Sequence, residues 1–321
     1  MPNKQLDSFL SYLRNERQSS EHTAESYRMD IEQFARMVLK KDIRENPESV
    51  NWNEVSVFSA RLFIMELQKN DITKTSTLRK ISSLRSFFRF MVREEFVKQN
   101  PFSGLTSPKK EKRLPKYMSV DEVGNLLDAP AKFWQAAKDN RTSKDDDSAN
   151  FAAARDSAIL EVIYSGGLRI SEALGLNIGD IDNINDIIKV KGKGKKERIA
   201  ALGKPASLAL STYFKIRGLR NSSNIQSSPV FVNKDGSRIS SRSFQRNFKQ
   251  YLSTAGLPAD MTPHKLRHSF ATHMLNAGAD MRSVQELLGH ANLSTTQIYT
   301  HVTAERLKIE YSKAHPRAKF N

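Results

Sequence analysis

A short basic segment with two prolines divides this chain, and it constrains the fold more than any other feature. The segment SPKKEKRLPKY, residues 107–117, carries five basic residues against one glutamate. Proline fixes φ and has no donor N–H, so such a stretch continues neither a helix nor a central strand. At 321 residues the chain is long enough for two cores. We therefore expect domains at 1–107 and 118–321, joined by an extended basic linker at 108–117.

The charge of the chain narrows the class of partner. There are 51 Lys and Arg residues against 35 Asp and Glu, a net charge of +16, which favours a polyanion. A membrane surface is disfavoured because no run of about 18 apolar residues occurs and the N-terminus lacks a signal-peptide core. We expect a cytoplasmic protein that binds nucleic acid. The absence of cysteine excludes disulfides, thiol nucleophiles and cysteine-ligated zinc.

Apolar residues recur at helical spacing through the first hundred residues and predict a small helical bundle. The three sets are Leu6, Phe9, Leu10 and Leu13; Tyr27, Ile31, Phe34 and Val38; and Leu78, Ile81, Leu84, Phe87, Phe88 and Met91. The last set shares its helix with four basic residues, Arg79, Lys80, Arg85 and Arg89. These form either an ordinary solvated face or a surface along DNA phosphates. The candidate DNA contacts are Arg79, Arg85, Lys109, Lys110, Lys112 and Arg113.

The second half of the chain reads as a mixed, mainly α domain. Ser119 and Glu122 have the spacing of a capping box, which starts a helix. The polar stretch at 131–150 predicts an insertion or flexible loop. Helical patterns follow at 154–164 and 168–176, separated by a double glycine. Three β-like runs at 187–190, 198–202 and 229–232 predict a small antiparallel sheet, and helices resume at Ser241.

Three motifs in this domain carry side chains suited to attack on a phosphodiester. They are GGLRISE at 166–172, TPHKLRH at 262–268, and LLGH at 287–290 followed nine residues later by Tyr299. Thr262 is a natural N-cap and Pro263 a natural first helical residue. Helix geometry then places His264 and Arg267 on one face, near a helix N-terminus that favours an anion.

The chemistry of these side chains requires no metal. Two arginines offer planar, permanently charged donors to the non-bridging oxygens of a phosphate. A tyrosine can form a covalent bond to one strand and so store the energy of the broken bond. The reaction also needs a general base and a general acid, and His264 and a lysine are available. Chemistry alone does not choose that lysine, because the 187–202 hairpin is crowded with basic residues: Lys189, Lys191, Lys193, Lys195, Lys196 and Arg198.

Each of these residues also has an ordinary structural interpretation. Tyr299 alone suits a packing residue, and Arg169 with Glu172 suits a buried ion pair. His264, His268 and His273 resemble metal ligands, but Arg267 on that face would repel a cation. We therefore expect no metal, and read His268 and His273 as structural.

Five segments favour the catalytic interpretation because of a resemblance that spans nearly the whole chain. They are NPFSGL at 100–105, LPKYMS at 114–119, GLRISEALGL at 167–176, KGKGKKERIAALG at 191–203, and HKLRHSFATHMLNAGADMRSVQELLGHANLSTTQIYTHV at 264–302. Together they resemble the tyrosine recombinases, and in particular the bacterial Xer-type chromosome-dimer resolvases. The resemblance implies a C-shaped clamp on duplex DNA, with an N-terminal SAM-like core-binding domain and a C-terminal catalytic domain.

The resemblance also implies a role for each site residue. Arg169, Arg267 and His290 would bind the scissile phosphate, and Tyr299 would attack it to give a 3′-phosphotyrosine and a free 5′-hydroxyl. Lys193 would be the general acid for the leaving oxygen, while His264 would assist proton transfer from the tyrosine. Glu172 falls at the supporting acidic position. No metal or nucleotide cofactor is implied.

The implied partners are double-stranded DNA with a dif-like inverted repeat, a tetramer of this chain alone or with a second Xer-type recombinase, and an FtsK-type DNA translocase. A phage or mobile-element integrase shares the chemistry, although no arm-binding domain precedes the bundle. A type IB topoisomerase would relax supercoils as a monomer. An architectural DNA-binding protein would not need this catalytic set. The tail after Tyr299 predicts a short amphipathic helix with Leu307 and Tyr311, which caps its own domain or docks on a neighbouring protomer.

Overall fold

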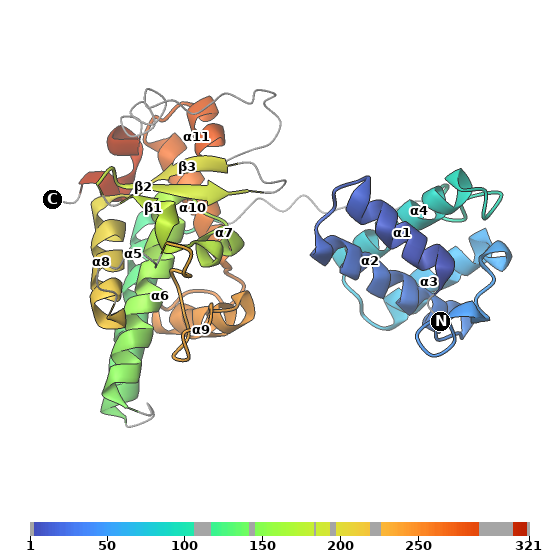
Figure 1. Cartoon of the computed structure of the whole chain (residues 1–321), viewed down its shortest axis with the longest axis horizontal. Helices are drawn as coiled ribbons and strands as arrows, with labels where there is room; N and C mark the ends of the chain where they lie inside the picture. Colours follow the sequence, from blue (N-terminus) through green and yellow to red (C-terminus); the bar gives the residue numbers. More distant parts are fainter. Residues whose placement is uncertain are drawn as a thin grey trace. The chain divides into compact units, whose positions relative to one another are not determined.

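The chain forms two compact units, residues 1–114 and 115–321, each with its own apolar core (Figure 1). The computed structural model describes residues 3–105, 117–140, 145–182, 184–192, 197–218, 226–288 and 311–319. The predicted linker, apart from Tyr117, lies outside these residues, so its extended form stays a prediction. No helix in these ranges is long and apolar enough to cross a membrane.

The first unit is the predicted helical bundle. Its α-helices in the described part are α1 (Lys4–Asn15), α2 (Glu21–Phe34), α3 (Val57–Lys69) and α4 (Lys74–Arg93). Shorter turns are the π-helical η1 (Ala35–Leu39) and the 3-10 turns η2 (Pro47–Ser49) and η3 (Trp52–Glu54). The predicted apolar faces meet in an aromatic core, where Phe9 and Phe87 pack edge to face with ring centroids 5.3 Å apart. The helical spacing of the sequence is confirmed here.

The second unit is mainly α, as predicted. Its long helices are α5 (Val120–Asp139), α6 (Asp146–Gly166), α8 (Lys204–Arg217), α9 (Ser241–Thr254) and α10 (Pro263–Asn276), with the shorter α7 (Ile170–Gly175) and α11 (Met281–Leu288). The 3-10 turns η4 (Ile178–Asp180) and η6 (Pro316–Lys319) complete the described elements. The predicted capping box is present, because Ser119 N–H donates to Glu122 and Glu122 N–H donates back to the Ser119 hydroxyl.

A three-stranded antiparallel sheet lies at one end of α5, α6 and α8, with α11 on its other side (Figure 1). It consists of β1 (Ile181–Asp182), β2 (Ile187–Lys191) and β3 (Glu197–Ala201) in that order. Ile188, Val190 and Ala200 are buried and face the helical core. The predicted hairpin of 187–190 with 198–202 is confirmed as β2 and β3, whereas the two-residue β1 was not foreseen.

The prediction of a loop over 131–150 is wrong, because α5 and α6 extend through most of it. The reason is tertiary. Phe133 and Trp134 pack against the core, and the Trp134 indole N–H donates to the Tyr251 hydroxyl at 3.0 Å. Tyr251 in turn donates to the buried Asp156 of α6. These contacts stabilise a helix whose other face is polar, and only residues 141–144 of the stretch lie outside the described part.

The prediction of a strand at 229–232 is also wrong. The segment forms only isolated bridges, Asn177 with Pro229 and Val232 with Arg238. Pro229 has no N–H for a ladder. The carbonyls of Pro229 and Val230 accept hydrogen bonds from the Arg217 side chain at 2.6 and 2.7 Å, so a side chain occupies two acceptors that a ladder would use.

The described part of the tail packs on its own chain. Tyr311 and His315 are buried, and their rings stack with centroids 4.4 Å apart. The Tyr311 hydroxyl shares a hydrogen bond of 2.7 Å with Ser165 at the end of α6, and Arg317 pairs with Glu161. In this structure the tail therefore covers its own unit. Leu307 lies outside the described residues.

The double glycine that ends α6 has no room for side chains. Gly167 adopts φ +56°, and a Cβ there would lie 2.6 Å from the Phe270 ring. We expect Gly167→Ala to destabilise the protein by on the order of 1–3 kcal/mol, because it adds left-handed strain to a steric clash. Gly175→Ala is the matched control, since its Cβ would meet nothing within 4 Å. Urea denaturation of both variants checks this, and equal stabilities would contradict it.

Candidate active site

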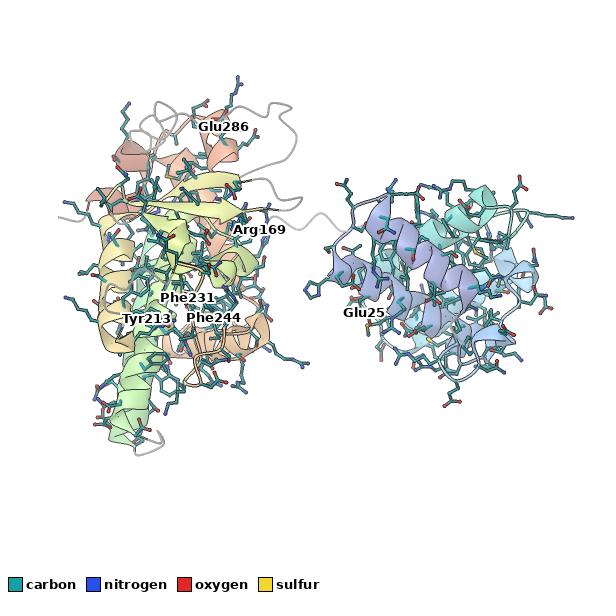
Figure 2. The ribbon with its side chains drawn as sticks, viewed as in Figure 1. Glu25, Arg169, Tyr213, Phe231, Phe244 and Glu286 are labelled. Atoms are coloured by element: carbon teal, nitrogen blue, oxygen red, sulfur yellow. The ribbon has the colours of Figure 1, made fainter. Side chains whose placement is uncertain are left out.

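The turn after α6 positions Arg169. Gly167 reverses the chain, and Arg169 becomes the N-cap of α7. Its backbone N–H donates to Glu172 Oε2 at 2.8 Å, and its guanidinium Nη1 donates to Glu172 Oε1 at 2.6 Å. The Arg169 side chain is still 43% exposed. Figure 2 shows it at the surface of the second unit, in contrast to Tyr213 and Phe231 in the interior.

Helix α10 supplies Arg267 and His264 to the same region. Thr262 caps the helix by accepting the N–H of Lys265, and Pro263 is its first residue, as predicted. Arg267 lies on the buried face of α10, and its Nη1 donates to the Gly167 carbonyl at 2.7 Å. Its Nη2 donates to the carbonyl of Leu288 at 2.6 Å, at the end of α11. Arg267 thus joins the double-glycine turn to the helix that precedes His290.

Glu172 is the shared counter-ion of the site. Its side chain is 5% exposed, and it accepts from three guanidiniums. Besides Arg169, Oε2 accepts from Arg198 Nη2 at 2.8 Å and from Arg267 Nη1 at 3.3 Å. Three elements, α7, β3 and α10, therefore converge on one carboxylate. Three positive charges against one negative charge leave a net positive cluster, which suits an oxyanion.

Burial and neighbouring positive charges lower the pKa values of two residues of α10, Arg267 and His264. Desolvation, followed by the charge of Arg169, lowers the pKa of Arg267 to about 10, which leaves it charged at neutral pH. Partial burial, followed by the charges of Arg267, His268 and Arg169, lowers the pKa of His264 below its ordinary value of 6.5. His264 is therefore neutral at pH 7, the form that can accept a proton.

Arg198 is the site residue whose place the sequence did not predict. The sequence groups it with the lysines of the hairpin, whereas in the structure its side chain is 6% exposed and pairs with Glu172. A usable signal was its register. Arg198 lies two residues before the apolar Ala200, on the inward face of a strand, where a charged side chain requires a partner.

Several predicted residues lie outside the described part of the chain. They are Lys193, His290, Tyr299, Lys109, Lys110, Lys112 and Arg113. Arg79 and Arg85 are described, and both have partners within the first unit. Arg79 pairs with the buried Asp30, and Arg85 donates to the carbonyls of Phe102 and Leu105 at 3.0 and 3.3 Å. Neither contact prevents the exposed part of a side chain from meeting a phosphate.

Among the histidines of α10, His273 has a structural role. His273 is buried, and its Nδ1 shares a hydrogen bond of 2.8 Å with the Tyr164 hydroxyl. This is the structural role expected for it. Within the ranges that the structure describes, no three His, Cys, Asp or Glu side chains group to hold a metal ion.

Comparisons with known proteins identify the architecture. The family model described as the phage integrase family matches residues 116–306, and that of the phage integrase N-terminal SAM-like domain matches residues 6–95. The fold and the arginine site thus define an integrase-type enzyme with a SAM-like domain before its catalytic domain.

Curated relatives narrow the class. Tyrosine recombinase XerC of Pelotomaculum thermopropionicum is 40% identical over 322 residues, which cover 98% of this chain and 98% of the relative. Tyrosine recombinase XerC of Haemophilus influenzae (strain PittEE) is 40% identical over 314 residues, also covering 98% of each. The chain belongs to the phage integrase family and is an Xer-type tyrosine site-specific recombinase.

A solved structure agrees with this fold. The XerH site-specific recombinase bound to difH substrate superposes with a TM-score of 0.63 at 22% identity, covering 96% of this chain and 84% of XerH. This similarity shows that the fold is shared.

Removing the charge of Glu172 should disrupt the site and the fold together. In Glu172→Gln, three arginines lose their buried counter-ion, and we expect a loss of on the order of 3 kcal/mol in the free energy of unfolding. Glu286→Gln on the surface of α11 is the control, because Glu286 pairs only with the exposed Arg282 at 3.5 Å among the contacts that the structure describes. Equal unfolding free energies for the two variants would contradict a central role for Glu172.

Proposed function

We propose that this recombinase cuts duplex DNA with Tyr299 and binds the scissile phosphate with Arg169, Arg267 and His290. The observation that carries the proposal is the convergence of Arg169 and Arg267 on Glu172. It supplies two guanidiniums held on rigid elements, and a phosphoryl transition state needs chiefly positioning and charge neutralisation.

The proposed reaction exchanges one phosphodiester for another. The Tyr299 oxygen bonds to phosphorus while the bond to the 5′ oxygen breaks, giving a 3′-phosphotyrosine and a 5′-hydroxyl. The tyrosine proton passes to His264, whose neutral form at pH 7 suits that role. Lys193 donates a proton to the leaving 5′ oxygen. Attack by the 5′-hydroxyl of another strand reverses these steps and rejoins the DNA without a nucleotide.

The remaining proposed contacts are with backbone phosphates other than the scissile one. The linker contacts the DNA backbone through Lys109, Lys110, Lys112 and Arg113. Helix α4 contacts DNA phosphates through Arg79 and Arg85. The net charge of +16 supports this, since phosphate contacts supply most non-specific affinity. Arg79 is half-exposed and would share its charge between Asp30 and a phosphate.

The proposed biological role is resolution of chromosome dimers at a dif-like inverted repeat. The assembly is a tetramer of this chain, alone or with a second Xer-type recombinase, acting with an FtsK-type translocase. Support comes from the near full-length similarity to relatives named XerC. Action on a mobile element is the alternative, and the identity of the DNA site separates the two.

Covalent capture tests the nucleophile and the target together. Cells that express the protein are lysed under denaturing conditions, and the DNA attached to it is sequenced. We expect enrichment at one short, near-palindromic locus, and complete loss of that signal in Tyr299→Phe, because phenylalanine cannot form the phosphodiester. A single chromosomal locus favours dimer resolution, and the ends of an element favour an integrase. Equal recovery from wild type and Tyr299→Phe would overturn the proposal.

The pH dependence of cleavage tests His264. Because the His264 pKa lies below 6.5, the neutral base persists at pH 7 and is lost only as the pH falls through that lower value. We expect the acid limb of the second-order cleavage rate, which reports the free enzyme, to lie below pH 6.5 and to vanish in His264→Gln. His22→Gln, on α2 of the first unit, should keep the limb. A limb that persists in His264→Gln would assign it to another group.

A further inference from the structure

Arg198 occupies a buried position on the inward face of β3, where apolar residues are usual. It pairs across the sheet with Val190 of β2, and both residues are buried. Ala200, two residues further along the same face, packs beside Gly166 at the end of α6. Burying a guanidinium in such a place is costly unless a carboxylate meets it, and an apolar pair is often at least as stable. The arginine therefore requires a reason other than stability.

The partner of Arg198 is the residue that orients the phosphate-binding arginines. Arg198 Nη2 donates to Glu172 Oε2 at 2.8 Å, and that same oxygen accepts the Arg169 backbone N–H at 2.8 Å and Arg267 Nη1 at 3.3 Å. One oxygen atom thus connects β3 to α7 and α10. Any shift of β3 relative to this oxygen changes the distance between the sheet and the arginine pair.

Arg198 belongs to the β2–β3 hairpin and lies near its connecting segment. β2 ends at Lys191 and β3 begins at Glu197, and these two residues pair across the ladder. Arg198 is the second residue of β3, so its contact with Glu172 lies one residue pair from the segment 192–196, which carries Lys193 in the sequence. A buried, short ion pair at that point limits how the start of β3 can move.

We propose that Arg198 is a positioning residue, which holds the start of β3 against Glu172 and so keeps the proton donor of the hairpin in register with the bound phosphate. The inference rests on the proposed function, in which Lys193 protonates the leaving 5′ oxygen. It predicts that loss of Arg198 impairs leaving-group protonation more than phosphate binding. A merely structural ion pair would impair both steps, or stability alone.

A substrate with a sulfur leaving group separates these outcomes. An alkoxide needs a proton to leave, whereas a thiolate leaves without one, so a 5′-bridging phosphorothiolate removes the need for a general acid. Single-turnover cleavage of nicked suicide DNA is measured with oxygen or sulfur at the scissile 5′ position. The variants are Arg198→Met, Arg198→Lys, Lys193→Ala as the proton-donor reference, Arg169→Ala as the phosphate-binding reference, and Lys215→Met on the surface of α8 as the matched control.

We expect Arg198→Met to cleave the oxygen substrate on the order of 100-fold more slowly than wild type, and the sulfur substrate at close to the wild-type rate. Lys193→Ala should behave in the same way, whereas Arg169→Ala should be slow on both substrates and Lys215→Met normal on both. Arg198→Lys keeps the charge and should recover part of the oxygen rate. The affinity of Arg198→Met for uncleaved DNA should match that of wild type.

Two outcomes would overturn the inference. One is an equal slowing of Arg198→Met on oxygen and sulfur, and the other is an unimpaired rate on oxygen. If Arg198→Met does not fold, Arg198→Lys decides, since a defect confined to the oxygen substrate supports the inference and a defect on both contradicts it. Failure of the proposed function has a different signature: Lys193→Ala is not rescued by sulfur, or wild type forms no covalent complex on either substrate.

Discussion

The buried carboxylate of Glu172 is the interaction on which the catalytic unit depends. Arg169, Arg198 and Arg267 come from three elements, and without a shared anion their charges would repel one another, two of them in a buried place. Glu172 is itself held at the first turn of α7, where its carboxylate also accepts the Arg169 backbone N–H. One side chain therefore fixes both the local turn and the long-range convergence.

The geometry around this carboxylate is set by contacts within the chain. The double glycine lets α6 end against Phe270, and the freed carbonyl of Gly167 becomes an acceptor for Arg267. The other donor of Arg267 holds the carbonyl of Leu288, where α11 ends. Charges fixed on rigid elements need little reorganisation as a transition state forms. Such prearranged charge stabilises the transition state of phosphoryl transfer, where catalysis is mainly positioning and electrostatic stabilisation.

The errors of sequence interpretation have a common cause. The stretch at 131–150 lacks helical periodicity over its polar centre, yet Tyr251 of α9 bonds to Trp134 of α5 and to Asp156 of α6 and so anchors both helices. The segment 229–232 has β composition, but side chains take three of its carbonyls: Arg217 donates to Pro229 and Val230, and Arg155 donates to Val232. In both cases a contact between distant residues outweighed the local pattern, which is how tertiary context overrides propensity.

The sequence by itself determined the features that depend on neighbouring residues: the apolar faces of α1 and α4, the caps at Ser119 and Thr262, the β2–β3 hairpin, and the residue types needed for attack on a phosphate. Only the tertiary structure decided that Arg198 is buried and that Glu172 serves Arg267, which lies 95 residues away. Capping and periodicity act within one or two turns of chain, whereas the sharing of one oxygen among three elements depends on how those elements pack.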